Sequence, residues 1–200
     1  MPIPILTCRI PNATSELITL TILIKMPLIR NAVQTDFTEI QVIYSEYVLK
    51  THATFEVIPP AKDELIRRWQ TITSDSLPYL IAELNNKVIG YAYASKYRSR
   101  SAYKYTIEDS VYVSPNSIGK GVGKALLKSI VQKCASLGYR QMIAVIGGSD
   151  NHSSINLHER CGFYQIGTMP STGYKLQQWV DSVMMQRQLG QGDQTNPSLE

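Results

Sequence analysis

The chain has 200 residues, of which 44% are hydrophobic and 18% are charged, and its formal net charge is +4. This length and balance are typical of one globular domain with a sizeable core. They exclude three classes of protein. No block of Lys and Arg suggests a nucleic-acid-binding arm, the three cysteines show no metal-ligand spacing, and no apolar run approaches the ~20 residues that span a bilayer. The simplest interpretation of the cysteines is reduced thiols inside the cell.

The first 27 residues form an N-terminal extension whose role the sequence does not define. Residues 17–24 are apolar, but a basic front and a clear cleavage site are missing, so they do not match a secretory signal. We expect a folded domain over residues 28–189, with Met26 as a natural or ancestral start. Gln, Gly, Asn and Pro after position 190 predict a flexible tail over 190–200.

The first half of the chain alternates between strand and helix patterns. In order, it predicts a strand over 28–33, a helix capped by Thr35 or Asp36, a helix over 61–71 after Pro59-Pro60, and strands over 79–84 and 87–94 joined by a turn at Asn85-Asn86.

The second half begins with a polar, basic loop over 95–103. It then predicts a strand over 105–113, a glycine-rich loop and its helix, a strand over 141–147, a helix over 153–161 that Gly162 ends, and strands over 163–169 and 180–187.

The glycine-rich loop organises the chain. Gly119, Gly121 and Gly123 stand at alternate positions between a β-forming segment and a helical pattern. Glycine lets backbone N–H groups approach a ligand, and a helix N-terminus carries unpartnered N–H groups and partial positive charge. The stretch therefore predicts a phosphate site. A Walker A loop would need Gly at Ile118 and a hydroxyl at Ala125, and a dinucleotide fingerprint would need its third glycine one position later.

Two motifs resemble a known family. Ser114-Pro-x-x-x-Gly-Lys-Gly-Val-Gly-Lys-Ala-Leu-Leu127 resembles the pyrophosphate loop of the GCN5-related N-acetyltransferases (GNAT), and Asn151-His-Ser-Ser-Ile-Asn-Leu-His-Glu-Arg-Cys-Gly-Phe163 resembles their second signature. Thr106-Ile-Glu-Asp-Ser-Val-Tyr-Val113 is similar to the phosphinothricin/methionine sulfoximine acetyltransferase branch. The likeness runs from about Leu28 to Leu189.

The resemblance implies an α/β fold, with a mixed, mostly antiparallel central sheet flanked by helices and a splayed pair of strands at the cofactor. It implies acetyl-CoA as cosubstrate without a metal, a cytoplasmic homodimer, and no nucleic-acid or membrane partner. The implied cofactor-binding residues are Val111, Tyr112, Val113, Gly119, Lys120, Gly121, Val122, Gly123, Lys124 and Asn151. In the family, a backbone N–H around 111–113 stabilises the oxyanion. Ile118 departs from the family's usual Arg or Gln, which puts cofactor affinity in doubt.

Glu108 and His158 are the candidate catalytic residues. A carboxylate facing a cleft could take a proton from an ammonium, and Asp109 is the rival. Because side chains alternate along a strand, only one of the two can face the pocket. His158 stands where the wider family usually has the Tyr that protonates the departing thiolate, and a histidine can donate a proton near neutral pH.

The resemblance places an acceptor pocket beside Phe55, which could equally be core. The branch's acceptors are anionic, so we expect Arg98 or Arg100 to contact them, with Tyr105 as a wall residue. The predicted function is direct transfer of acetyl from acetyl-CoA to the amine of a small, amino-acid-like substrate. The alternatives are acetylation of a protein or peptide amine and a non-catalytic acetyl-CoA-binding module.

Overall fold

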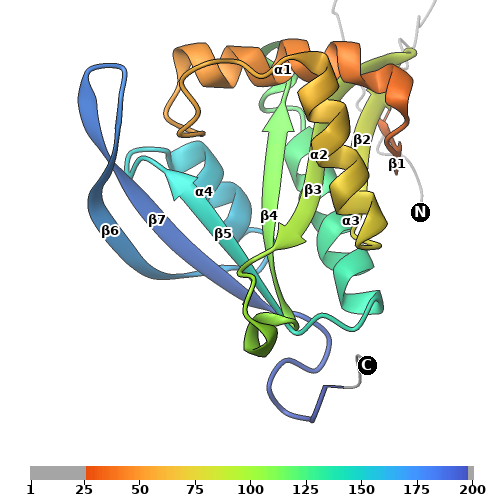
Figure 1. Cartoon of the computed structure of the whole chain (residues 1–200), viewed down its shortest axis with the longest axis vertical. Coiled ribbons are helices and arrows are strands. Elements are labelled where there is room, and N and C mark those ends of the chain that lie inside the picture. The colour runs from red at the N-terminus through yellow and green to blue at the C-terminus, as the bar shows by residue number, and fades with distance from the viewer. Residues whose placement is uncertain (1–25, 198–200) are drawn as a thin grey trace, which may run out of the picture.

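The computed structural model describes residues 26–197, so the predictions for residues 1–25 lie outside the described part of the chain. Seven strands form one sheet in the order β1-β2-β3-β4-β5-β7-β6 (Figure 1). Their bounds are β1 Leu28–Asn31, β2 Tyr79–Leu84, β3 Lys87–Lys96, β4 Thr106–Val113, β5 Gln141–Gly147, β6 Tyr164–Lys175 and β7 Gln178–Gln188. The β4–β5 pair is parallel and the other pairs are antiparallel. The predicted fold class is confirmed.

Helices cover both faces of the sheet. The helix bounds are α1 Phe37–Lys50, α2 Lys62–Ser74, α3 Val122–Ser136 and α4 His152–Glu159. One core packs α1 and α2 against β2, β3 and β4, around Phe37, Ile40 and Tyr91. The other packs α3 onto the opposite face, around Leu126, Leu127, Ile130 and Met142. The helices α1, α2 and α3 therefore each pack an apolar side against the sheet, as the helical spacing in the sequence predicted.

Local signals set several boundaries. Asn85 and Asn86 adopt φ of 52° and 58°, which closes the β2–β3 hairpin with the left-handed turn that Asn tolerates. Gly162 adopts φ of 84° three residues after the end of α4, where the Gly162 and Phe163 N–H groups donate to the Glu159 and His158 carbonyls and so end the helix. Both predictions are confirmed.

The β6–β7 hairpin is longer than the sequence predicted. The expected strands over 163–169 and 180–187 left ten residues between them, but the strands continue to a turn at Leu176 and Gln177, both at positive φ. The β6–β7 pairing changes register between Met169 and Gly173. This irregularity accommodates Pro170, so the strand continues through a region whose sequence resembles a loop. In Figure 1 the hairpin reaches past α4 towards the segment that follows α1.

The two ends of the described chain differ from the expectations in detail. The first strand ends at Asn31 rather than Val33. Residues 190–197, predicted as part of a flexible tail, return to the domain, where the Arg140 guanidinium donates hydrogen bonds to the Gly192 and Asn196 carbonyls and to the Thr195 hydroxyl. Within residues 26–197, no helix is long and apolar enough to cross a membrane.

Candidate functional site

A cavity of about 720 Å³ opens where β4 and β5 separate. The two strands pair from Thr106 with Gln141 to Asp109 with Ala144, and no pairing continues beyond Asp109. Figure 1 shows them side by side at one end and diverging towards their arrowheads. Residues 110–113 of β4 therefore have β3 on one edge and an open edge on the other.

The direction of the β4 backbone groups follows from three hydrogen bonds. The Ser114 N–H donates to the Ile89 carbonyl on β3, whereas Val113 meets the Tyr47 hydroxyl through its carbonyl (2.7 Å) and its N–H (3.3 Å). Because backbone groups alternate along a strand, Val111 points its N–H to the same open edge as Val113. Of the three expected backbone positions, Tyr112 faces β3, Val113 is contacted by Tyr47, and Val111 faces the gap.

The end of α1 and the residues after it hold the two strands apart. The Tyr47 hydroxyl binds Val113 on β4. On the other side, Gly147 at the end of β5 lies so close to the His52 carbonyl that a Cβ at position 147 would collide with it. The buried ammonium of Lys175 on β6 donates to the Thr54 carbonyl at 2.7 Å, which fixes the same segment from outside.

The glycine-rich loop forms one wall of the cavity, as its spacing predicted. Gly119 and Gly121 adopt φ of 79° and 80°, and Gly121 is the N-cap of α3. The first helical bond runs from the Ala125 N–H to the Gly121 carbonyl, so the N–H groups of residues 122–124 have no helical partner. A Cβ at either glycine would meet no atom within 4 Å, so the loop is open to a ligand. These features suit a diphosphate.

The cavity's charged and polar lining fits the same ligand. Lys124 and Arg160 line it, and both side chains can pair with phosphate. Lys120 is not among its lining residues, and its ammonium donates to the Asn116 carbonyl at 2.8 Å. Asn151 caps α4 through the Ser154 N–H and donates to the Gly147 carbonyl, so it connects β5 to the helix.

His158 and Asp109 both line the cavity, and their side chains contact each other. His158 Nε2 lies 3.1 Å from Asp109 Oδ2, and its Nδ1 lies 2.7 Å from the Ser154 carbonyl oxygen. Burial lowers the pKa of His158, but the Asp109 carboxylate and the Ser154 carbonyl outweigh it, so the net pKa is raised. Of the two rival carboxylates, Asp109 is the one that lines this cavity.

Glu108 lies on the opposite face of β4. It is half-buried, on the side of the strand that carries Ser110 and Tyr112 towards α1 and α2. Burial and the Asp109 charge raise the pKa of Glu108, and the Arg98 charge lowers it in part. The sheet thus separates two carboxylates at its point of divergence, one on each face.

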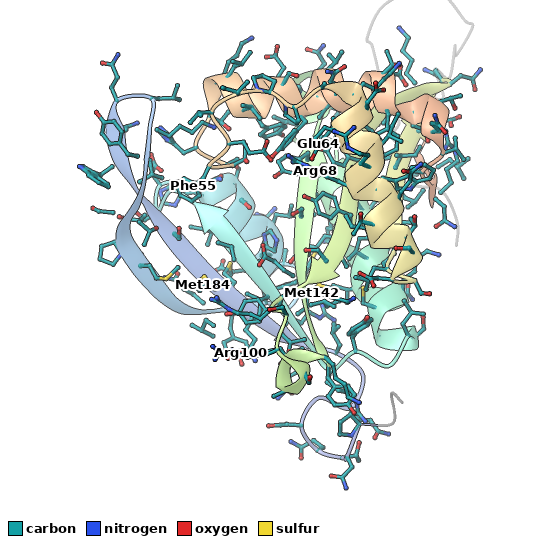
Figure 2. The ribbon with its side chains drawn as sticks, viewed as in Figure 1. Phe55, Glu64, Arg68, Arg100, Met142 and Met184 are labelled. Atoms are coloured by element: carbon teal, nitrogen blue, oxygen red, sulfur yellow. The ribbon has the colours of Figure 1, made fainter. Side chains whose placement is uncertain are left out.

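The four residues predicted to bind substrate lie outside the cavity's lining. The Phe55 ring packs against Gly173 of β6, where a Cβ would collide with it. The Arg98 guanidinium lies over the Tyr97 ring, and the Tyr105 carbonyl accepts N–H groups from Arg140 and Gln141. Arg100 lies at the other end of the sheet from Phe55 (Figure 2).

Several lining residues were not predicted. Tyr47, His52, Ser153, Asn156 and Arg160 belong to this group. Helical spacing could have identified the last three, because Ser153 and Asn156 share one face of α4 and Arg160, its C-cap, continues that face. His52 carries no local signal, since only the tertiary contact with Gly147 brings it to the site.

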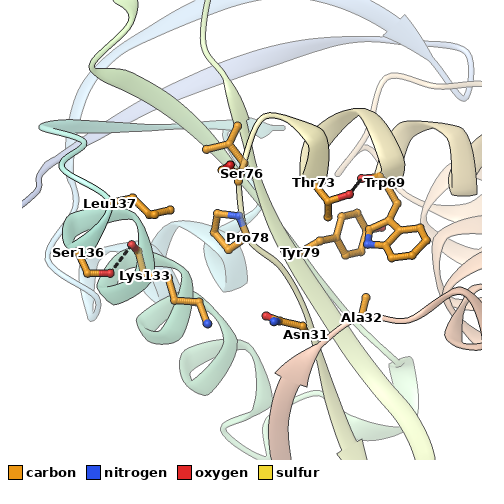
Figure 3. A pocket seen from close by; sticks show the side chains of 11 residues that line it. Asn31, Ala32, Trp69, Thr73, Ser76, Pro78, Tyr79, Lys133, Ser136 and Leu137 are labelled. Carbon is orange, nitrogen blue, oxygen red and sulfur yellow. Dashed lines mark hydrogen bonds between the residues drawn. The ribbon is translucent and has the colours of Figure 1, made fainter. Parts of the chain in front are cut away.

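A second cavity, of about 410 Å³, lies at the far ends of α2 and α3 (Figure 3). Asn31, Trp69 and Lys133 are among its lining residues, and Trp69 Nε1 is buried without a hydrogen-bond partner. It contains no glycine-rich turn and no helix N-terminus. Among residues 26–197, no group of three or more His, Cys, Asp or Glu side chains is arranged to hold a metal ion.

Comparisons with known proteins agree with this geometry. The profile of the Acetyltransferase (GNAT) family matches residues 40–163. The chain is 46% identical to a phosphinothricin N-acetyltransferase of Alcaligenes faecalis, over 81% of this chain and 82% of the relative. It is 36% identical to an L-methionine sulfoximine/L-methionine sulfone acetyltransferase of Salmonella typhimurium, over 80% and 94%. A phosphinothricin acetyltransferase from Sinorhizobium meliloti, solved in complex with acetyl-CoA, superposes with a TM-score of 0.84 at 47% identity, over 87% and 94%.

The left-handed turn at Gly121 generates a prediction for ligand binding. We expect Gly121→Ala to weaken coenzyme A binding about tenfold, because an L residue at this φ is strained by roughly 1–2 kcal/mol and relaxes by turning the loop N–H groups away. Isothermal titration calorimetry measures the change. Gly190→Ala is the matched control, since Gly190 also has positive φ and open space around it. Equal affinities for the two variants would contradict the assignment of the loop.

Proposed function

Because this chain belongs to the GNAT family of acetyltransferases, we propose that it transfers acetyl from acetyl-CoA to the amine of a small, amino-acid-like substrate of the phosphinothricin or methionine sulfoximine type. The single observation that carries the proposal is the divergence of β4 from β5 beside an exposed helix N-terminus. A diphosphate held at residues 119–124 leaves the gap between the strands for a thioester. The names of the relatives support the substrate class.

The two faces of β4 suggest a division of labour. Acetyl transfer to an amine needs a neutral amine, a donor for the oxyanion and a proton for the departing sulfur. We propose that Glu108, on the α1/α2 face, takes the proton from the amine. We propose that His158, on the α3/α4 face, gives a proton to the departing sulfur. The Val111 N–H, which points into the gap between them, is the proposed oxyanion donor. We infer direct transfer, because the two cysteines among residues 26–197, Cys134 and Cys161, are buried and burial raises the pKa of both thiols.

We propose that the acceptor is bound by Phe55, Arg98, Arg100 and Tyr105. The charge of Arg98 acts on Glu108 and partly lowers its pKa, which supports a place for Arg98 beside the proposed base. The buried free thiols suit a reducing compartment, and we infer a cytoplasmic enzyme.

A substrate assay tests the proposed function. We expect phosphinothricin and methionine sulfoximine to be acetylated on nitrogen with a kcat/KM at least about tenfold above that of short peptides, because a site built for a small anionic amine leaves its charges unpaired with a peptide. Release of coenzyme A and the mass of the product measure the reaction. Acetylation of peptides alone would favour the protein-amine alternative, and binding of acetyl-CoA without any turnover would favour the non-catalytic module.

Glu108 generates a prediction for the pH dependence. Glu108→Gln should lower kcat by roughly 10²–10⁴-fold, the usual range for loss of a general base. Because the pKa of Glu108 is raised, the wild-type kcat/KM should increase with pH through a midpoint above the ordinary glutamate range, and the variant should lose this limb. Steady-state rates across pH measure both effects. Glu46→Gln removes an exposed carboxylate paired with Lys50 and should leave the profile unchanged; equal profiles for the three proteins would contradict the assignment.

The β6–β7 hairpin supports a homodimer. β6 is an edge strand, and the hairpin exposes Tyr174, Leu176 and Trp179 to 59%, 49% and 67%. A long apolar edge of this kind is typical of an interface with a second chain. We infer that a second copy covers it.

Light scattering after size exclusion tests the dimer. We expect twice the chain mass for the wild type and the single mass for Trp179→Glu, because a buried unpaired charge opposes association. Val42→Glu alters an apolar side chain of α1 that is 64% exposed, and it should stay dimeric. A wild-type protein that is monomeric at the concentrations of the assay would refute the inference.

A further inference from the structure

The contact between His158 and Asp109 restricts where protons can lie. Nδ1 of His158 is 2.7 Å from the Ser154 carbonyl, and a carbonyl can only accept, so Nδ1 carries a proton. Nε2 is 3.1 Å from Asp109 Oδ2. If Nε2 and the carboxylate were both unprotonated, two lone pairs would face each other. One further proton therefore lies in this contact.

The burial of both side chains also favours a proton between His158 Nε2 and Asp109 Oδ2. The side chains of His158 and Asp109 are 6% and 1% exposed. Asp109 Oδ1 is buried and has no hydrogen-bond partner among residues 26–197. A buried carboxylate with a single contact is costly unless its partner carries positive charge. Imidazolium beside carboxylate makes the pair neutral overall, so the shared proton also stabilises Asp109.

Other ionisable groups around the pair do not replace this contact. Glu108 lies on the other face of β4, and β5 contributes no ionisable side chain. Phe163 packs its ring edge-on to the imidazole, with centroids 5.0 Å apart. Cys134 and Cys161 lie within electrostatic reach of Asp109, and the cationic groups Lys124, Lys128 and Arg187 surround Cys161. His52, Lys124, Asp150 and Arg160 line the same cavity as the pair.

We propose that Asp109 is a positioning residue that keeps His158 doubly protonated on the cavity wall, so that the pair holds the proton that the departing coenzyme A sulfur takes. The inference rests on the proposed acetyl transfer. As the N–C bond forms, the amine loses a proton on the Glu108 side. As the C–S bond breaks, its electron pair stays on sulfur, which takes the proton from the pair, and solvent then restores that proton.

Histidine titration by NMR tests the pair without reference to turnover. The chain has three histidines, His52, His152 and His158, so spectra of protein labelled in the imidazole rings can be assigned with His52→Gln and His152→Gln. We expect His158 to titrate above the ordinary histidine range in the wild type. In Asp109→Asn its midpoint should fall by about one pH unit, which is tenfold in proton affinity.

The kinetic readout should move in the same direction. Because His158 must be protonated, kcat falls as pH rises through its midpoint, and Asp109→Asn should shift that limb to lower pH with little change in KM. Asp36→Asn is the matched control. Counted over the whole residue, Asp36 and Asp109 are both 6% exposed, but Asp36 binds Arg30 and does not line the cavity. Its loss should therefore lower stability and leave the His158 titration unchanged.

Three results would overturn the proposal. The first is a wild-type His158 that is neutral at pH 7, which also decides the matter if Asp109→Asn does not fold. The second is a His158 midpoint that is the same with and without Asp109. The third is a shifted midpoint with an unshifted kcat profile, which would overturn the catalytic use of the proton. Failure of the wild type to acetylate any amine would refute the proposed function instead, and the titration would separate the two failures.

Discussion

The separation of two neighbouring strands is the constraint on which the site depends. Parallel strands gain hydrogen bonds by staying paired, so an open edge inside a sheet needs something to hold it open. Here the end of α1 does so from both sides: Tyr47 satisfies the backbone of Val113 on β4, and His52 packs directly on Gly147 of β5. The Lys175 ammonium donates a hydrogen bond to the Thr54 carbonyl, which connects the segment after α1 to the β6–β7 hairpin. Contacts within the fold therefore keep the gap between β4 and β5 open.

This gap brings together groups that the sheet otherwise keeps apart. Glu108 and Asp109 are neighbours in sequence, but strand alternation sends them to opposite faces of β4. In the proposed mechanism, one face accepts a proton from an amine and the other supplies a proton to a thiolate. The Asp109 charge still raises the pKa of Glu108 across the strand, so the two carboxylates stay electrostatically coupled although their side chains face different helices. The strand β4 thus separates the proposed base from the proposed acid, and we propose that the reacting bond lies between them.

The sequence predicted those parts of the site whose chemistry is local. Glycines at positive φ in the loop and at Gly162, and Asn85-Asn86 in the hairpin turn, are each required by backbone conformation, so their types reveal their places. Contacts between distant segments were not predictable in this way. Alternation showed that Glu108 and Asp109 face opposite ways, but the choice of face depends on which helices pack there. Likewise, the basic loop before β4 suggested substrate arginines, whereas Arg100 lies at the far end of the sheet from Phe55 (Figure 2).

The most direct measurement of the central claim is a crystal structure of this protein with acetyl-CoA. We predict the diphosphate within hydrogen-bonding distance of the N–H groups of residues 119–124 and the thioester in the gap beside Val111, between the faces that carry Glu108 and His158. Density for the ligand in the cavity beside Trp69, or a β4–β5 pair that closes when acetyl-CoA binds elsewhere, would contradict it.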